Sequence, residues 1–279
     1  MHNKIFLHPC FARSNFGRIH LPVAPRCNIQ CNYCSRGVTL EHRPGAYKRV
    51  LKPNVAVELA KRFMEKHPYI TVIGVAGPGD PLYNRETFET FELIRNWKIM
   101  KCLCTNGLLL PENVYKLRDL GLDFITITIN CIDAEIGAKI YSYVKYNGEM
   151  FDGTDGAEIL IQNQLKGLKI ASKFMIVKVN TVLIPGINDE HIVEVAKKIR
   201  NYAYIQNIIP LIPQYKFSDV EKPSKEMLRD VRDQCSKYVK QMYHCAMCRA
   251  DSAGRLDERK NFDLSLKDAI FKSNQSKRS

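Results

Sequence analysis

The sequence contains no long uninterrupted hydrophobic segment. No stretch approaches the roughly 20 uncharged apolar residues that a membrane span requires, and the first residues, MHNKIFLHPC, lack the apolar run of a secretion signal. We therefore expect a cytoplasmic protein that does not enter a membrane. Because the reducing cytosol keeps thiols free, the ten cysteines indicate metal or redox chemistry rather than disulfides.

The chain also lacks a recognisable nucleic-acid-binding motif, although its formal net charge is +13. Such a charge could indicate nucleic acid, an acidic protein partner or an anionic substrate. Much of it falls on predicted helical faces and in residues 260–279, where basic residues commonly serve solubility. We predict no specific nucleic-acid partner.

Short apolar, β-branched segments alternate with helical patterns along most of the chain. This alternation is typical of a parallel sheet covered by helices. The six predicted strands are 19–24, 70–76, 101–105, 124–130, 176–183 and 205–211. After a short turn at 31–35, the predicted helices are 54–66, 85–97, 111–120, 134–143, 157–172 and 189–202. We predict an α/β fold of the (β/α)6 partial TIM barrel type.

The predicted barrel occupies residues 18–221 and has a short extension on either side. Residues 1–17 precede it, and residues 222–254 follow with one helix, 224–243, and a C-x2-C pair. Residues 255–279 form a polar tail that we predict to be disordered. Ligands of parallel α/β folds bind at the carboxyl ends of the strands, and a cysteine motif directly follows the first strand.

This motif, Cys27-Asn-Ile-Gln-Cys31-Asn-Tyr-Cys34, contains three thiolates in one tight loop and no fourth cysteine. Three thiolates can hold three corners of a 4Fe-4S cubane and leave the fourth iron open. An open iron can chelate S-adenosylmethionine (SAM), from which one electron releases a 5′-deoxyadenosyl radical. The alternative, structural zinc, normally takes C-x2-C pairs and four ligands. The motif, with Tyr33 before its last cysteine, therefore predicts a radical SAM enzyme.

Three further strand ends offer candidate contacts for SAM. The turn Gly77-Pro78-Gly79-Asp80 would let the backbone approach a ligand closely, so its polar groups could meet the methionyl ammonium. Asn130 and Asn180 could bind the ribose and carboxylate. The alternatives are an ordinary turn between strand and helix for the first and turn-forming asparagines for the other two.

Several longer strings resemble the NifB family of nitrogenase cofactor maturases. They are HLPVAPRCNIQCNYC (20–34), VAGPGDPL (75–82), TNG (105–107), TITIN (126–130), EIGAKIY (135–141), KVN (178–180), LIPGINDEH (183–191) and HCAMCRAD (244–251). The similarity runs over residues 8–254. It implies fusion of two 4Fe-4S clusters with a SAM-derived carbide and an added sulfur, which gives an 8Fe-9S-carbide precursor of the nitrogenase cofactor.

The resemblance also implies ligands in both extensions for two substrate clusters. One cluster would be held by Cys10, Cys245 and Cys248, and the other by His8 and Cys102, with Glu41 as a transient ligand. Considered alone, the C-x2-C pair also fits half a zinc knuckle or a redox pair, and Cys102 fits a core position. The remaining cysteines are expected to be structural: Cys104, Cys131 and Cys235.

The sequence departs from the family where a further cysteine is expected, because Val38 stands at about that position. Glu41 or His42 could substitute, the cluster could bind more loosely, or the substrate could differ. Two alternatives therefore remain: a radical SAM enzyme acting on a peptide, tetrapyrrole or RNA with an auxiliary cluster, and a non-enzymatic iron-sulfur scaffold or carrier.

The maturase reading implies protein partners. We expect reduced ferredoxin or flavodoxin as electron donor, an iron-sulfur cluster donor, and a scaffold protein that accepts the product. We expect the chain itself to be a monomer.

Overall fold

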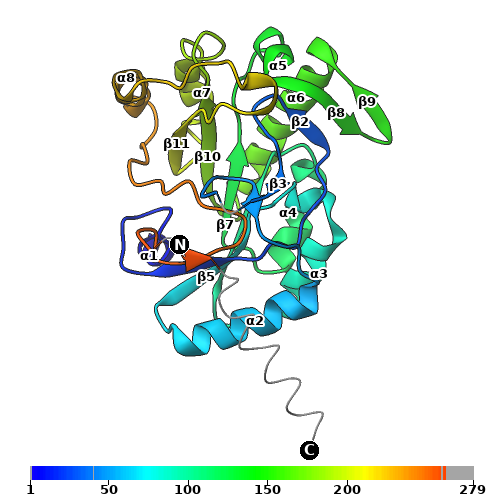
Figure 1. The fold of residues 1–279 in the computed structure, drawn as a ribbon, viewed down its shortest axis with the longest axis vertical. Coiled ribbons are helices and arrows are strands. Elements are labelled where there is room, and N and C mark those ends of the chain that lie inside the picture. The colour runs from blue at the N-terminus through cyan, green and yellow to red at the C-terminus, as the bar shows by residue number, and fades with distance from the viewer. Residues whose placement is uncertain (1, 40, 259, 262–279) are drawn as a thin grey trace, which may run out of the picture.

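A computed structural model describes residues 2–39, 41–258 and 260–261 of the chain. An eight-stranded sheet lies at its centre, with the order β11-β10-β7-β6-β5-β1-β12-β13. The first six strands in this order are parallel and correspond to the six predicted ones (Figure 1): β1 (Gly17–His20), β5 (Ile70–Val75), β6 (Met100–Thr105), β7 (Phe124–Thr128), β10 (Ile176–Leu183) and β11 (Ile205–Pro210). The first strand ends at His20, because Pro22 and Pro25 have no amide hydrogen for the ladder.

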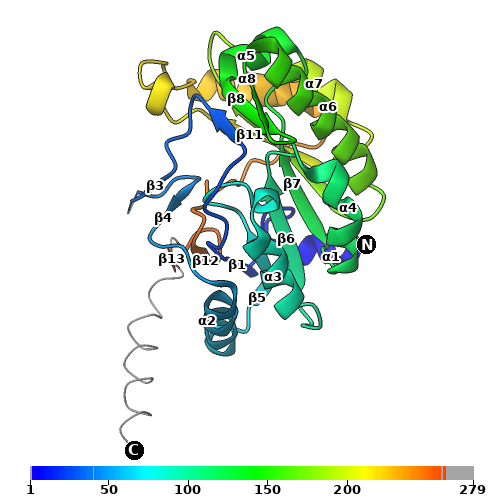
Figure 2. The same cartoon turned by 90° about the vertical axis from the view of Figure 1, so that its right-hand side faces the viewer.

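Helices cover the outer face of this curved sheet (Figure 2). They are α2 (Pro53–Lys66), α3 (Arg85–Leu93), α4 (Leu110–Asp119), α6 (Gly153–Ala171), α7 (Ile192–Ile199) and α8 (Lys225–Ser236). Their apolar faces and the outward side chains of the strands share one core, as the helical periodicity predicts. On the inner face, part of the sheet forms a separate apolar cluster with Ile5, Phe11 and Met242, and polar side chains and thiols occupy the rest. Within the described residues no helix is both long and apolar enough to cross a bilayer.

The predicted helix 134–143 is wrong in its last three residues. Helix α5 (Ala134–Ile140) stops, and a hairpin of β8 (Tyr141–Tyr146) and β9 (Glu149–Phe151) follows. Asn147 and Gly148 form its turn, with φ of 51° and 85°. Asn-Gly favours such a turn because both residues tolerate positive φ, and the aromatic and β-branched residues of β8 favour a strand.

The hairpin pairs antiparallel with β2 (Ile29–Cys31), which belongs to the cysteine motif. A second small sheet joins β3 (Gly37–Val38) to β4 (Ala46–Tyr47). None of these short strands was predicted. Helix α8 is also shorter than the predicted 224–243.

Both extensions return to the inner face of the sheet. Helix α1 (His2–Leu7) leads into the segment that carries His8 and Cys10. After α8, the Met242 amide donates to the Gln206 carbonyl at 2.8 Å, and β12 (Ser252–Gly254) pairs antiparallel with β1. Of the predicted disordered tail, Lys260–Asn261 forms β13 beside β12, which corrects the prediction there; residues 259 and 262–279 lie outside the described residues.

Candidate active site

One cavity of about 290 Å³ opens at the inner face of the sheet and brings together most of the predicted site residues. These come from both extensions, the cysteine loop (residues 27–34) and the strand ends. The predicted residues that line it are His8, Cys10, Cys27, Cys31, Tyr33, Cys34, Gly79, Asp80, Cys102, Asn130, Asn180, Cys245 and Cys248. Gly77 and Glu41 are not part of the lining.

Backbone carbonyls in the cysteine loop are held by two side chains from the same segment. Gln30 Nε2 donates to the carbonyls of Cys31 and Cys34 at 2.9 and 2.8 Å. Arg36 in turn donates to Gln30 Oε1 at 2.7 Å and to the Ile29 carbonyl at 3.1 Å. The loop therefore has a fixed shape in which the three thiols line one cavity, as a shared cluster requires.

The loop thiols are protonated at neutral pH in the chain without a cluster. Burial and the nearby Asp80 carboxylate raise the pKa of Cys27 from 9.0 to about 11. Burial likewise raises the pKa of Cys31 and of Cys34. The side-chain amide of Asn106 lies 3.8 Å from Cys27 Sγ, where it can donate to a thiolate. Three thiolates on one buried loop fit a resident 4Fe-4S cluster, and assembling it must release their protons.

The turn at 77–80 packs directly on the loop that enters the cysteine motif. A Cβ on Gly79 would lie 2.1 Å from the Arg26 carbonyl oxygen, so only glycine fits. Gly77 has φ of 122°, which also requires glycine. Asp80 is 3 % exposed and its carboxylate accepts from Thr105 Oγ1 and from the amides of Asn106 and Leu82. Asp80 thus ties this turn to the end of β6, and the cradle for a ligand is formed by backbone.

The two asparagines occupy different parts of the cavity. Asn130 donates to the hydroxyls of Tyr33 and Tyr141 at 2.9 and 3.2 Å, so it lies beside the cysteine loop. Asn180 accepts at 3.1 Å from Asn207, whose side-chain amide also lies 3.2 Å from Cys245 Sγ. Asn180 therefore belongs as much to the C-x2-C group as to a SAM site.

The second group of thiols joins the two extensions of the chain. Cys10, Cys245 and Cys248 all line the cavity. Arg18, which is 2 % exposed, donates to Cys248 Sγ at 2.8 Å and to the Gly254 carbonyl at 2.6 Å. Burial raises the pKa of Cys248, and the Arg18 guanidinium acts against this rise in favour of the thiolate, which is the form that binds iron.

His8 and Cys102 lie at the base of the cavity. Burial and the Lys178 charge lower the pKa of His8 well below its usual value, so the ring is neutral, as metal ligation requires. Its Nδ1 accepts from the Cys10 amide at 3.1 Å, and its Nε2 is buried without a hydrogen-bond partner among the described residues. Because Nδ1 accepts, the proton of the neutral ring is on Nε2, so iron binding at Nε2 requires this proton to leave. The buried nitrogen without a partner marks a place for a ligand at the base of the cavity.

The segment around Glu41 is anchored to the C-x2-C loop by its backbone. Arg249, with no exposed surface, donates to the carbonyls of Thr39 and Glu41 at 2.7 and 2.5 Å. The Glu41 carboxylate points elsewhere, because it is 70 % exposed and pairs with Arg43 at 2.8 Å. His42 Nε2 lies 3.1 Å from the Ala246 carbonyl. Glu41 is thus near the C-x2-C loop, but its side chain is outside the cavity.

Among the lining residues that the sequence reasoning missed are three that can bind metal or carry charge: His20, Cys104 and Lys178. Cys104, expected to be structural, lies in the lining, whereas Cys131 and Cys235 belong to the hydrophobic core. Burial lowers the pKa of His20 to about 3. A signal existed for Cys104, because residues i and i+2 of a strand face the same side and Cys102 was already a candidate.

Lys178 has an unusual setting for a lysine. It is 6 % exposed and lies on β10, on the inner face of the sheet. Burial acts to lower the pKa of Lys178, but nearby thiols raise it, and the net direction is upward. The thiols responsible, in order of effect, are those of Cys10, Cys104, Cys245 and Cys102. The ammonium is therefore charged, and both groups of substrate-site thiols lie within reach of it.

The spacing of these donors does not fit a single metal ion. Among residues 2–39, 41–258 and 260–261, no group of three His, Cys, Asp or Glu side chains is placed to hold one. A zinc ion needs thiolates about 2.3 Å from a common point, whereas a cubane offers separate iron corners to more widely spaced thiols.

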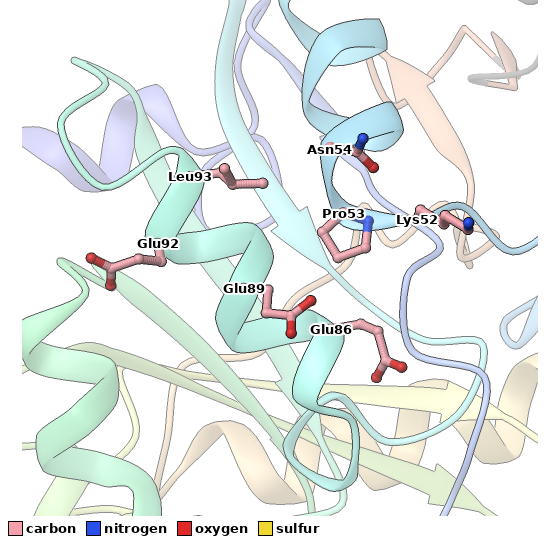
Figure 3. A pocket seen from close by; sticks show the side chains of 7 residues that line it. All are labelled: Lys52, Pro53, Asn54, Glu86, Glu89, Glu92 and Leu93. Atoms are coloured by element: carbon pink, nitrogen blue, oxygen red, sulfur yellow. The ribbon is translucent and has the colours of Figure 1, made fainter.

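A second hollow, of about 630 Å³, lies on the outer surface between the start of α2 and helix α3 (Figure 3). Its lining includes Lys52, Pro53, and the carboxylates of Glu86, Glu89 and Glu92. It has no thiol or imidazole among its lining residues. We assign the chemistry to the thiol-lined cavity.

Comparisons with known protein sequences agree with the radical SAM chemistry that the thiol-lined cavity suggests. The Radical SAM superfamily profile matches residues 21–199. The FeMo cofactor biosynthesis protein NifB of Methanocaldococcus infernus is 47% identical over 261 residues, which are 90% of this chain and 86% of that protein. NifB of Methanocaldococcus jannaschii is 46% identical, over 96% of this chain and 92% of that protein. NifB of Klebsiella pneumoniae is 44% identical over 92% of this chain but only 58% of its own length.

Solved structures agree in fold. Streptococcus suis SuiB superposes with a TM-score of 0.61 at 12% identity, over 82% of this chain and 49% of SuiB. The structure of anSMEcpe with bound AdoMet gives 0.54 at 19% identity, over 81% of this chain and 63% of anSMEcpe. At these identities the comparison shows only that the fold is shared.

Proposed function

The chain belongs to the radical SAM superfamily and, within it, to the NifB family of FeMo cofactor biosynthesis, and from this we propose that it fuses two 4Fe-4S substrate clusters. The product would be an 8Fe-9S-carbide precursor containing a SAM-derived carbon and an added sulfur. One observation carries the proposal: three separate groups of iron ligands line one cavity. A radical SAM enzyme with an organic substrate and one auxiliary cluster would need only two of them.

Each group has a distinct task in this proposal. Loop thiols Cys27, Cys31 and Cys34 hold the resident cluster. Cys10, Cys245 and Cys248 hold one substrate cluster, and His8 with Cys102 holds the other. When bound, the resident cluster and SAM supply a methyl group and, after one-electron reduction, a 5′-deoxyadenosyl radical.

The chain's own residues position this chemistry. Gly79 lines the cavity, so the backbone of turn 77–80 would meet the methionyl end of SAM there. Asn130 and Tyr33 lie between the cysteine loop and the strand ends, where the rest of SAM would lie.

Two single variants, one in each group of thiols, separate the roles of these groups. We expect the parent, reduced with dithionite, to convert SAM into both S-adenosylhomocysteine and 5′-deoxyadenosine. Cys31→Ala removes a ligand of the resident cluster and should abolish SAM cleavage. Cys245→Ala should spare abortive cleavage to 5′-deoxyadenosine while it stops cluster fusion. Equal loss in both variants contradicts the assignment.

A second candidate function rests on the position of Val38, which is 69% exposed and outside the cavity lining. With no thiol there, one substrate site has few ligands, which favours a related radical SAM enzyme with an auxiliary cluster and an organic substrate. Product analysis distinguishes the two, because that enzyme yields 5′-deoxyadenosine without S-adenosylhomocysteine, or a methylated organic product.

The partners follow from the reaction. We propose a cytoplasmic monomer that receives electrons from reduced ferredoxin or flavodoxin, accepts clusters from a donor protein and passes its product to a scaffold. Docking of an acidic electron donor on a basic surface weakens with salt. The rate of reduction by ferredoxin should therefore fall as ionic strength rises.

A further inference from the structure

The substrate site of His8 and Cys102 has two protein ligands, whereas the site of Cys10, Cys245 and Cys248 has three. Two ligands leave half of a cubane's corners without protein donors. The proposed transient ligand Glu41 does not remedy this, because its carboxylate is exposed and paired with Arg43. A further donor from the cavity wall is needed, provided the proposed function holds.

Cys104 is such a donor by position. It follows Cys102 by two residues on β6, so both side chains face the same side of the sheet, and both line the cavity. Cys104 is partly exposed and Cys102 is buried, which places Cys104 nearer the open space. A strand holds both thiols at a fixed separation, so they can bind one cluster without a loop rearrangement.

Lys178 provides an independent indication of what occupies this part of the cavity. In the ladders Lys178 is paired with Thr126, and Thr126 with Cys104, so the three residues form one row across β10, β7 and β6. Lys178 and Cys104 are two strand spacings apart, ~10 Å between backbones, which a lysine side chain can span in large part. All three residues line the cavity.

The Lys178 ammonium has no carboxylate partner and no hydrogen-bond acceptor oxygen within the part of the chain that the structure describes. Its Nζ lies 5.5 Å from the centroid of the Phe11 ring, a contact too weak to compensate a buried charge. A cation on a side chain that is 6 % exposed favours an anion at this place in the cavity. A thiolate-ligated iron-sulfur cluster is such an anion.

We propose that Cys104 is a protein ligand of the second substrate cluster, beside Cys102, and that Lys178 is a positioning residue that neutralises this cluster. Ligation is an exchange without electron transfer. The Cys104 thiol gives its proton to solvent, and its sulfur binds an iron from which the carrier's thiolate departs. The inference rests on the proposed function, because it needs a cluster to be delivered to this site.

Iron content of the anaerobically reconstituted full chain tests the role of Cys104. The parent should hold about 12 irons, and Cys104→Ala should fall toward about 8 while its resident cluster still cleaves SAM. Cys235→Ala is the matched control, since Cys235 has no exposed surface and belongs to the hydrophobic core. It should keep the parent's iron content.

The outcomes separate this inference from the proposed function. A parent that holds only about four irons overturns both. A parent with about 12 irons and a Cys104→Ala variant with the same content overturns the inference alone. If Cys104→Ala does not fold, alkylation of the parent decides: Cys104 should react with N-ethylmaleimide in the iron-free chain and be protected in the loaded chain. Equal reactivity in both overturns the inference.

The role of Lys178 is tested by the reduction potential of the second substrate cluster, which would not change if Lys178 had only a structural role. A nearby cation stabilises the reduced cluster, so Lys178→Met should lower the reduction potential of one cluster and Lys178→Arg should restore it. Potentiometric titration followed by electron paramagnetic resonance measures this. An unchanged potential in Lys178→Met contradicts the assigned role.

Discussion

Replacement of Arg249 by methionine should destabilise the fold and empty one cluster site. Arg249 is fully buried and makes a two-pronged pair with Asp251, with Nε to Oδ1 at 2.7 Å and Nη2 to Oδ2 at 3.1 Å. It also binds the carbonyls of Thr39 and Glu41. Methionine keeps most of the volume but leaves the Asp251 carboxylate, 3% exposed, without its cation. Removing one partner of a buried pair costs ~3–5 kcal/mol.

Urea unfolding of the iron-free chain measures this loss. With a slope of ~3 kcal/mol/M, the unfolding midpoint of Arg249→Met should fall by ~1 M or more. The double variant Arg249→Met with Asp251→Asn removes both charges and should recover part of the loss. Both variants should lose the irons held at Cys245 and Cys248, because this loop loses its anchor to residues 39–41. A midpoint equal to the parent's would refute the assigned role of the pair.

Three further predictions concern the SAM side of the cavity. Gly79→Ala should lower the free energy of unfolding by ~1–3 kcal/mol and weaken SAM binding, because the new Cβ meets the Arg26 carbonyl oxygen at 2.1 Å. Gly148→Ala is the control, because Gly148 has φ of 85° and no atom within 4 Å of the added Cβ. Equilibrium dialysis should find its SAM binding unchanged. Gln30→Leu removes the donor to the carbonyls of Cys31 and Cys34, so the resident cluster should lose iron faster to a chelator, and equal rates would contradict this. Calorimetry in buffers of different ionisation enthalpy should find one proton released per loop thiol on cluster assembly near pH 7.

The stability of the iron-free chain should depend on pH in the alkaline range, with a definite sign. The pKa of Cys27 is raised from 9.0 to about 11 in the folded chain, so the folded state binds more protons than the unfolded state between these values. The contribution to stability is complete below pH 9 and is lost as pH rises through 11. The urea unfolding midpoints of the parent and of Cys27→Ala should be measured at pH 8 and at pH 10.5. The midpoint of Cys27→Ala should fall less between these two pH values than the midpoint of the parent.

The six parallel strands could be predicted from the sequence, because each is a short continuous segment of apolar, β-branched residues. Such a segment can be recognised without knowledge of the tertiary fold. The cysteine loop could be found because all its ligands lie within eight residues of one another. The hairpin after α5 was missed although Asn147-Gly148 is a strong turn signal, because the apolar pattern of Tyr141–Tyr146 also suits a helix face. Its pairing with β2 depends on the tertiary fold.

The rest of the cavity could not be predicted from local patterns. Lys178 lies in a strand whose other residues are mostly apolar, and nothing in the sequence indicates that its side chain faces thiols from segments far along the chain. Cys104 is an exception, because it follows the candidate Cys102 by two residues on one strand. The pairing of β12 with β1, which returns Cys248 to Arg18, likewise depends on contacts between residues more than 200 positions apart.

The central claim is that one cavity holds three iron-sulfur clusters. Mössbauer spectroscopy with iron and sulfide counting on the anaerobically reconstituted parent tests it most directly. We predict about 12 irons in three cubanes, of which only one changes its spectrum when SAM is added. About four irons in a single SAM-responsive cluster would contradict the claim.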